Sequence, residues 1–594
     1  MPRFRARSHV LRAVGPETHR AKGYAMNRFL GCTCLLAAAL AATSARGAAP
    51  PAPTKWQWVY APCNFQVDAR GDELVALAKR AKTAGYNGLL VTDSKFARLQ
   101  ERPKNYYANL ARFKKAADEL GLDIVPAVCP VGYSNDILQN DPNQAEGIAV
   151  RDAPFIVRGK EAVLSDRENL LPGGSFEQAG PKGFTGWDWM DGFGQVIVQD
   201  TAVKHSGAAS ARLGDFRKGE AHGNCRLVKK LTLTPWRQYH LSVWIKTDAA
   251  APAGDIRLVV LAPDGRSLNY AYLGVKPTQD WTQHHVVFNS MEYAGLSLYV
   301  GIWGGKAGTI WIDDAALEPC AGVNMLRREG CPVRVTSDDG KQEYAEGRDF
   351  ERWEYPKMGR VPWAGEFEPY HPEPPLRLAA GTRIRDGERL RVSFYHTVLI
   401  HEGQICGCLR SEPLFGYMET EVRLLKQYLA PKKFFMRHDE LRVAGQCGLC
   451  RKEGVTAGQV LAENVRRCAA MIRKIEPEAE IFVWSDMFDP HHNAVDKYYL
   501  VGSTLAGSWE GLDPSIRIAN WNGGHRDQSL PFFAGRGHKQ ILAAYYDAAD
   551  TKAQLEGWLN SAAKVQGVEG VMYTTWQQNY KDVEAFAKVL RGGM

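Results

Sequence analysis

The pattern that most constrains the fold is an alternation of strand and helix that is interrupted in the middle of the chain. Short apolar runs alternate with amphipathic helical stretches from about residue 56 to 132, and the alternation returns after residue 389. Between about 169 and 319, short strand patterns are separated by turns containing Gly and Pro, with almost no helical period. Because strands that alternate with helices form parallel sheets, we expect one α/β unit, made from both ends of the chain, with an all-β insertion.

The two alternating regions contain nine strand candidates. Parallel strands with helical crossovers close into a barrel of eight, so we predict an α/β fold, a (β/α)8 barrel of the TIM type interrupted by an inserted all-β jelly-roll sandwich. One candidate must then lie outside the ring, and 124–128 or 391–396 is favoured for this. The candidates are 58–61, 88–92, 124–128, 391–396, 433–437, 481–484, 516–521, 540–545 and 570–573.

The predicted organisation has five parts. They are an N-terminal extension with a signal peptide at 1–49, the first part of the barrel at 50–168, the β-sandwich at 169–319, a β-rich connector at 320–388 and the second part of the barrel at 389–594.

An export signal is indicated by Arg28, the apolar run from Phe29 to Ala42 and the small residues that follow it. The run is too short to span a bilayer. We therefore expect a secreted or periplasmic protein without a membrane span, with translation starting at Met26. A lipoprotein anchored at Cys32 is less favoured, because most of the apolar run follows that cysteine.

The basic charge of the chain is concentrated in this N-terminal extension. Residues 1–49 contain eight Lys or Arg residues and one acid, a net charge of +7 out of the chain's +8, which leaves about +1 for the rest. A nearly neutral remainder does not indicate a nucleic-acid partner.

The cysteines leave three interpretations open. Ten of the twelve lie after the signal, and Cys406-x-Cys408 with Cys447-x-x-Cys450 has part of the spacing of a four-sulfur zinc site. Export makes disulfides possible, and we favour a Cys447–Cys450 disulfide or free thiols over zinc. In the barrel regions no other His or acid cluster has metal-ligand spacing, so we expect no metal and no cofactor.

Two adjacent carboxylates, Asp439 and Glu440, follow the apolar strand pattern at 433–437. Paired acids at the end of a strand are what cleavage of a glycosidic bond requires: one donates a proton to the leaving oxygen, and the other stays charged near the developing cation. Because active sites of such barrels lie at the carboxyl ends of the strands, we predict that Asp439 and Glu440 are catalytic.

The neighbouring strand ends carry aromatic residues beside carboxylates or amides, as expected of a pocket that stacks rings on sugar faces. The predicted substrate-binding residues are His438, Trp484, Asp486, Trp509, Glu510, Trp521, Tyr545, Asp547 and Trp576.

Two family resemblances accompany these motifs. The steps Asn169-Leu170, Phe176-Glu177, Gly186-Trp187, His205-Ser206-Gly207 and Trp311-Ile312-Asp313-Asp314 resemble those of jelly-roll carbohydrate-binding modules. The region of about 430–580 resembles family 20 hexosaminidases and family 123 N-acetylgalactosaminidases: Asp439-Glu440 is similar to their catalytic pair, Trp484-Ser485-Asp486 to a W-x-D motif, Tyr545-Tyr546-Asp547 to a Y-L-D motif and Trp576 to a pocket tryptophan. Gln578 departs from the Glu of family 20.

The second resemblance implies a secreted glycoside hydrolase that removes a β-linked N-acetylhexosamine with retention, GalNAc being favoured over GlcNAc. The 2-acetamido oxygen would attack C1, Asp439 would stabilise the resulting oxazolinium ion and Glu440 would be the acid, with Tyr545 holding the acetamido carbonyl. Two alternatives remain: a glycosidase that pairs Glu440 with Glu510 or Asp486 without acetamido participation, and a non-catalytic glycan-binding protein, which Gln578 favours. In every case the expected partner is a glycan or glycoconjugate.

Overall fold

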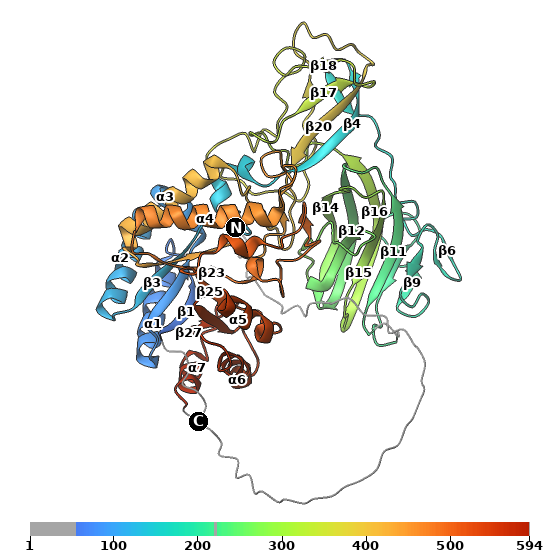
Figure 1. Ribbon diagram of the computed structural model, residues 1–594. Helices are drawn as coiled ribbons and strands as arrows, with labels where there is room; N and C mark the ends of the chain where they lie inside the picture. The colour runs from blue at the N-terminus through green and yellow to red at the C-terminus, as the bar shows by residue number, and fades with distance from the viewer. Residues whose placement is uncertain (1–54, 219–221, 593–594) are drawn as a thin grey trace, which may run out of the picture.

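Eight parallel strands close into a barrel built from both ends of the chain (Figure 1). The computed structural model describes residues 55–218 and 222–592, so the expected signal peptide lies outside the described residues. The ring closes where Trp56 of β1 pairs with Gly570 of β27. In ring order the strands are β1 (Trp56–Pro62), β2 (Gly88–Thr92), β3 (Asp123–Val128), β21 (Lys433–Met436), β23 (Glu480–Trp484), β25 (Arg517–Asn520), β26 (Gln540–Tyr545) and β27 (Val568–Thr574).

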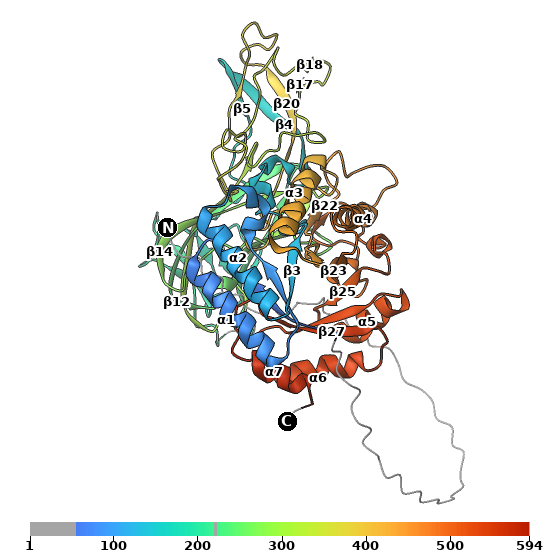
Figure 2. The same ribbon diagram turned by 90° about the vertical axis from the view of Figure 1, so that its left-hand side faces the viewer.

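Helices cover the outside of the ring (Figure 2), but one crossover departs from a strict eightfold repeat. In the described chain β23 and β25 are joined by the short 3-10 turns η5 (Asp486–Phe488) and η6 (Ser508–Gly511) without an α-helix. At Gly511 a Cβ would come within 2.4 Å of the Ala462 carbonyl oxygen, so η6 lies directly on α4. The helices are α1 (Asp68–Ala84), α2 (Lys104–Glu119), α3 (Glu412–Leu429), α4 (Ala457–Ile475), α5 (Arg526–Gly535), α6 (Thr551–Ala562) and α7 (Val583–Leu590).

The helix α4 illustrates how local sequence starts these elements. Thr456 and Gln459 form a reciprocal capping box, in which each side chain accepts from the other residue's backbone N–H. The apolar residues then recur on one face, which α4 buries against the barrel. This face also carries Asn464 and Cys468, both fully buried.

The interior of the barrel is filled with aromatic side chains. Trp56, Trp58 and Phe482 lie within 4.6–6.4 Å of one another between ring centroids. Trp484 and Phe435 continue this packing toward the carboxyl ends of the strands, at 4.7 Å. The barrel is therefore a packed core with its chemistry confined to the mouth.

The insertion contains a β-sandwich of two antiparallel sheets. One sheet has the order β14 (Gln279–Asn289), β12 (Gln238–Ala251), β16 (Ala307–Cys320), β10 (Ser210–Leu213), β9 (Ile197–Asp200). The other has the order β13 (Ile256–Leu261), β15 (Gly295–Ile302), β11 (Cys225–Thr232), β8 (Trp189–Met190). A small hairpin pairs β6 (Ala179–Gly180) with β7 (Gly183–Phe184), and η4 (Ala253–Asp255) precedes β13.

A third unit, a six-stranded antiparallel sheet, projects beyond the barrel and the sandwich (Figure 1). The candidate strand 391–396 belongs to this sheet, whereas 124–128 lies in the ring as β3. The order is β18 (Glu343–Tyr344), β17 (Arg334–Ser337), β20 (Arg389–His396), β4 (Ile148–Arg158), β5 (Glu161–Leu164), β19 (Leu376–Arg377).

The whole insertion leaves the barrel after β3 and returns just before α3, and its two crossing segments are paired. The backbone N–H of Glu146 donates to the Cys406 carbonyl at 2.8 Å, and that of Cys408 donates to the Gln144 carbonyl at 2.9 Å. The base of the insertion is thus closed by a short antiparallel bridge between Ala145 and Gly407. The turns η1 (Ser94–Glu101), η2 (Ile137–Gln139) and η3 (Pro142–Gln144) lie on the barrel side of it.

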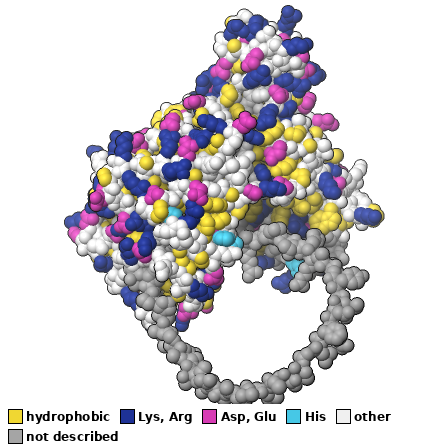
Figure 3. Space-filling model, viewed as in Figure 1, with side chains coloured by type: hydrophobic (Ala, Val, Ile, Leu, Met, Phe, Trp, Pro, Cys, Tyr) yellow, Lys and Arg dark blue, Asp and Glu magenta, His cyan; other side chains and the backbone are white. Residues whose placement is uncertain are grey.

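The surface mixes charges of both signs. Figure 3 shows Lys and Arg interspersed with Asp and Glu over the face seen in Figure 1. Among the described residues, no helix combines the length and apolar character needed to cross a membrane.

Candidate functional site

Glu440 lies at the carboxyl end of β21 and is held by contacts on several sides. Its carboxylate accepts a hydrogen bond from the Tyr133 hydroxyl and pairs with Arg442, whose Nη2 lies 2.9 Å from Oε2. Its backbone N–H donates to Asp486 Oδ2 at 2.8 Å. The backbone at Glu440 has φ 48°, a left-handed conformation that non-glycine residues adopt at a cost. The side chain is 25 % exposed, so it remains accessible from the barrel mouth.

The two adjacent acids have opposite electrostatics. Burial raises the pKa of Asp439 to about 6, more than the nearby Arg437 lowers it, and the Glu440 charge adds to the increase. Burial would also raise the pKa of Glu440, but Arg442 and the Tyr133 hydrogen bond outweigh it and hold that pKa below its usual value. Glu440 is therefore the ionised member of the pair, and Asp439 is the member that keeps its proton longer, up to about pH 6.

Asp486 holds the backbone of the loop that carries Glu440. It is fully buried, and its carboxylate accepts from the Glu440 N–H, from Asn493 Nδ2 at 2.9 Å and from Trp521 Nε1 at 3.2 Å. Burial, with the Asp439 charge adding to it, raises the pKa of Asp486 to about 7, although the N–H donors act in the opposite direction. With its oxygens engaged by three donors, Asp486 positions Glu440 and Trp521, in place of the direct sugar contact that the sequence predicted.

A close backbone contact brings the loop after β3 against the same site. A Cβ at Gly132 would lie 1.9 Å from the Asp439 carbonyl oxygen. Only glycine allows this approach, and it sets Tyr133 beside Glu440.

Aromatic rings line the mouth next to the carboxylates. Tyr60 and Trp576 are 5.0 Å apart between ring centroids, and Trp484 lies 6.0 Å from Trp576. Tyr546 is 5.8 Å from Trp576 and stacks nearly parallel on Trp521 at 5.7 Å. The structure thus brings together the predicted residues Trp484, Trp521 and Trp576. Trp484 is buried beneath the others, which are partly exposed. Partly exposed rings beside polar groups are typical of small-ligand sites.

At the end of β26, the tyrosine ring at the mouth lies one residue later in the sequence than predicted. Tyr545 lies outside the barrel, stacked on Tyr573 at 4.1 Å, and its hydroxyl donates to Asp582 at 3.3 Å. Tyr546 faces the mouth instead, close enough to Glu440, Asp486 and Asp439 to feel their charges, and burial together with these charges raises the pKa of its hydroxyl. The structure therefore places Tyr546, and not the predicted Tyr545, at the mouth. Ile541 and Ala543 face the barrel interior, so regular alternation would also turn Tyr545 inward, but positive φ from Tyr545 to Asp547 breaks the alternation.

Asp547 has a supporting role. Its carboxylate accepts from the Thr575 hydroxyl at 2.6 Å and from the Trp576 backbone N–H at 2.8 Å. These contacts fix the loop after β27 and with it the ring of Trp576.

His438, Trp509 and Glu510 lie away from the mouth. His438 is fully buried against α4, with Nε2 2.9 Å from Asn464 Oδ1. Trp509 and Glu510 lie in η6 on the outside of the barrel, where Trp509 packs on Phe532 at 5.6 Å and Glu510 pairs with Arg536 at 2.9 Å. The structure thus places these three predicted substrate-binding residues away from the mouth, and it also separates Glu510 from Glu440, with which one alternative paired it.

Several mouth residues come from loops that the sequence did not single out. Gln404 donates to the Glu440 carbonyl at 2.9 Å and accepts from Arg442 at 2.8 Å. His401 lies close enough to Glu440 to interact electrostatically. Arg442, two residues after Glu440, was visible as a nearby charge, but Tyr133, His401 and Gln404 are distant in sequence and carry no local signal.

The sandwich also reaches the mouth. The Tyr270 ring lies parallel to His401 at 5.4 Å, and the His401 backbone N–H donates to the Tyr270 carbonyl at 2.9 Å. Lys497 pairs with Asp264 of the same sandwich loop at 3.3 Å. The sandwich therefore contacts the loops around Glu440 directly.

Two surface cavities lie elsewhere. One of about 370 Å³ is lined by charged residues that include Arg328, Arg410 and Glu463, and one of about 570 Å³ lies on the six-stranded sheet beside Tyr344 and Arg383. We place the candidate active site at the barrel mouth, because that is where buried carboxylates with opposed pKa shifts meet aromatic rings.

Fold and site together define a parallel-barrel protein with carboxylates at its mouth and an inserted β-sandwich. No family model and no curated protein matches the chain. Among solved structures, a rhamnosidase from Novosphingobium sp. PP1Y is 12% identical, with 91% of this chain and 59% of that chain covered and a TM-score of 0.32.

Two carbohydrate-binding modules match a smaller part. The CBM22-1 xylan-binding domain of Paenibacillus barcinonensis Xyn10C is 17% identical over 26% of this chain and 97% of its own, with a TM-score of 0.21. The structure titled "Family 16 Carbohydrate Binding Module-2" is 18% identical over 25% and 99%, with a TM-score of 0.19. These scores are low, so function is inferred below from the site, and the resemblance to families 20 and 123 stays a prediction.

Proposed function

We propose that this protein is a glycoside hydrolase whose active site is the mouth of the barrel. The observation that supports this is the split between Asp439, whose pKa burial raises to about 6, and Glu440, whose pKa Arg442 and Tyr133 lower against burial. Two neighbouring carboxyl groups pushed apart in this way provide an acid and an anion in one site.

The electrostatics assign roles opposite to those implied by the family resemblance. Asp439 would donate a proton to the glycosidic oxygen, and Glu440 would remain ionised and stabilise the positive charge that develops at C1. Tyr546 and Trp576 would stack on the sugar, and the buried Trp484 supports the ring of Trp576 from the barrel core. Arg442 and Tyr133 position Glu440 and do not take part in proton transfer.

We further propose a β-linked 2-acetamido sugar as substrate, with GalNAc favoured over GlcNAc and net retention. The support is the resemblance over about 430–580, with the roles of Asp439 and Glu440 exchanged relative to it, together with the aromatic rings of the mouth beside the two acids. The acetamido oxygen would act as the nucleophile, so the site would need only one acid and one anionic partner.

A panel of chromogenic β-GalNAc, β-GlcNAc and β-glucoside substrates tests the proposal. We expect turnover of the acetamido sugars, and a fall of about 10²–10⁴-fold in kcat/KM for Asp439→Asn and of about 10²–10³-fold for Glu440→Gln. Glu510→Gln is the control, because the structure places Glu510 outside the barrel in an ion pair with Arg536. Turnover of the glucoside alone would reject the acetamido mechanism, and unchanged activity in both mouth variants would reject the site.

A second candidate function is glycan binding without catalysis, as a secreted lectin-like protein. The ion pair between Glu440 and Arg442 favours it, since it compensates the charge of the carboxylate. Binding of a sugar by calorimetry, without turnover of any substrate in the panel, would support this function over hydrolysis.

A further inference from the structure

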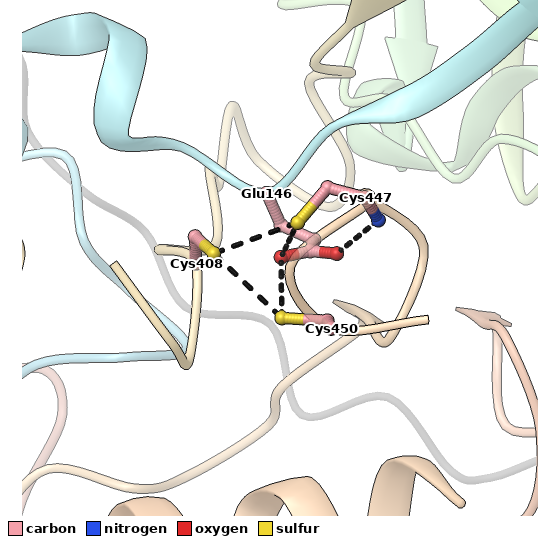
Figure 4. A group of neighbouring side chains, drawn as sticks. All are labelled: Glu146, Cys408, Cys447 and Cys450. Carbon is pink, nitrogen blue, oxygen red and sulfur yellow. Dashed lines mark hydrogen bonds between the residues drawn. The ribbon is translucent and has the colours of Figure 1, made fainter. Parts of the chain in front are cut away.

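Three cysteines and one glutamate meet at the base of the insertion, outside the barrel mouth (Figure 4). Glu146 lies on the segment that leaves the barrel, Cys408 on the segment that returns, and Cys447 and Cys450 on the loop that follows Glu440. All four side chains are buried, with at most 1% of each exposed.

The distances within the group match the ligand shell of a single ion. Cys408 Sγ lies 3.6 Å from both Cys447 Sγ and Cys450 Sγ, and Glu146 Oε2 lies 3.6 Å from the same two sulfurs. Sulfurs bound at about 2.3 Å around a tetrahedral zinc are separated by roughly 3.8 Å, and a zinc-bound carboxylate oxygen lies slightly closer to them. A disulfide would require sulfurs about 2.05 Å apart.

Two backbone N–H groups hold Glu146 so that its other carboxylate oxygen can serve as a metal ligand. Glu146 Oε1 accepts from the backbone N–H groups of Gln446 at 2.7 Å and Cys447 at 2.9 Å. Oε2 is left facing the sulfurs, with only their weak S–H donors as partners. Outer contacts of this kind orient the ligands of metal sites, whereas a buried carboxylate oxygen without a strong partner is costly.

The guanidinium of Arg328, which is partly buried, offsets part of the negative charge that such a site would carry. Three thiolates and a carboxylate around a divalent ion leave a net charge of −2. Arg328 is close enough to Cys408, Cys447 and Glu146 to interact electrostatically, and its Nη2 donates to the Ala145 carbonyl at 2.8 Å. The backbone turn that brings Cys450 next to Cys447 is closed by the Cys450 N–H, which donates to the Cys447 carbonyl at 3.0 Å.

We propose that Cys408, Cys447, Cys450 and the Oε2 atom of Glu146 bind one zinc ion that joins the base of the insertion to the loop carrying Asp439 and Glu440. A tetrahedral set of sulfurs with one oxygen suits zinc better than the hard ions magnesium and calcium. With four protein ligands no position is open to a substrate, so the ion is structural. The proposal departs from the expectation of no metal and from the four-cysteine set weighed in the sequence, because Glu146, which no cysteine spacing could reveal, takes the place of Cys406.

Metal content of the untagged full-length protein tests the proposal without reference to activity, so its outcome is independent of the proposed hydrolase function. We expect about one zinc per chain by inductively coupled plasma mass spectrometry. After exchange with cobalt, the protein should show thiolate-to-cobalt charge transfer and the intense visible bands of tetrahedral coordination. A wild-type protein purified without stoichiometric metal, and unable to take up zinc or cobalt when its thiols are reduced, would overturn the proposal.

Single substitutions test which side chains bind the zinc. Cys408→Ser and Cys450→Ser should lose the zinc, and Glu146→Gln should weaken binding by at least tenfold in competition with a chelator. Cys320→Ser is the matched control, since Cys320 is buried in the insertion away from the group. Cys331→Ser addresses the fifth thiol, which contacts Cys447; it should keep the zinc, and loss of zinc there with retention in Glu146→Gln would overturn the role of Glu146.

Mass spectrometry of alkylated protein covers the case in which a variant fails to fold. In the zinc form, chelation should be needed before Cys408, Cys447 and Cys450 react with iodoacetamide. A disulfide between any two of the three in freshly purified, metal-free wild-type protein would show that the group is an oxidised crosslink and would refute the zinc site.

Discussion

At the scale of single residues, Asp439 and Glu440 differ because their neighbours differ. Both are surrounded by protein, and burial raises the pKa of each. Only Glu440 has a guanidinium at 2.9 Å and a phenol hydrogen bond that outweigh burial. The two acids are therefore chemically distinct although they are adjacent in the sequence.

The pH dependence of kcat/KM should reflect this difference. The active form has Asp439 protonated and Glu440 ionised, so activity should decline as the pH rises through about 6. Replacement of Arg442 by Met removes a charge that lowers the pKa of Glu440, so the acid limb should move to higher pH by about 1–3 units. The surface variant Arg334→Met is the control, and an unchanged acid limb in Arg442→Met would contradict the assignment.

Ionisation of the buried Asp439 carboxyl group should also lower the free energy of unfolding at neutral pH. Its folded-state pKa of about 6 lies above the ordinary value, so the stability that its protonated form contributes is present at low pH and lost as the pH rises through about 6. Asp439→Asn should thus stabilise the protein at pH 8 by up to about 3 kcal/mol and change it little at pH 4. Urea unfolding at both pH values measures this, and equal effects at the two would contradict it.

At the scale of elements, the backbone conformation at the ends of the strands decides which residues reach the mouth. The end of β26 turns Tyr545 outward and Tyr546 inward, and Tyr545, Tyr546 and Asp547 all have positive φ, between 49° and 76°. Three consecutive left-handed residues are costly, and here they coincide with the point where the chain delivers a ring to the site. Trp509 and Glu510 lie in η6, which packs on α4 in the outer layer of the barrel.

Neighbouring tyrosines give a matched test of this register. Tyr546→Ala should raise KM by about tenfold, since it removes a stacking ring worth about 1.4 kcal/mol, whereas Tyr545→Phe should leave KM and kcat within twofold because only an outer hydrogen bond is lost. Steady-state kinetics on the responsive aryl glycoside provides the measurement. The reverse result would restore the role first given to Tyr545.

At the scale of the whole molecule, the insertion and the barrel are joined at two places. The paired segments around Glu146 and Cys408 close the base of the insertion, and Tyr270 of the sandwich packs on His401 beside Glu440. An insert that touches the mouth is more than a tethered module, so removal of 169–319 is expected to disturb the active site.

Tyr270 allows this coupling to be measured without a deletion. Tyr270→Ala should lower kcat/KM by about tenfold, equivalent to about 1.4 kcal/mol of lost positioning, with little change in the unfolding temperature of the barrel. Trp189→Ala, an exposed residue elsewhere on the sandwich, is the control. Equal kinetics for the two variants would show that the sandwich does not support the site.

The sequence by itself determined features that depend on local patterns. Apolar runs located all eight barrel strands, since a buried parallel strand must be apolar on both faces, and the loss of helical period marked the all-β insertion. Asp439 and Glu440 were located by their position just after β21, and Trp484, Trp521 and Trp576 by theirs after β23, β25 and β27. These assignments need only the direction of the chain and the rule that parallel strands end at one side of a barrel.

Only the tertiary structure decided which of these residues meet and in what state of charge. Tyr133, Gln404 and Arg442 come to Glu440 from three loops, Tyr270 comes from the inserted sandwich, and Glu146 completes a group of cysteines more than 250 residues further along the chain. The pKa of a carboxyl group and the ligands of a metal depend on atoms within a few ångströms in space, whatever their separation in sequence. For that reason the different environments of Asp439 and Glu440, the positions of His438 and Tyr545 away from the mouth, and the Cys–Glu group appeared only once the chain was folded.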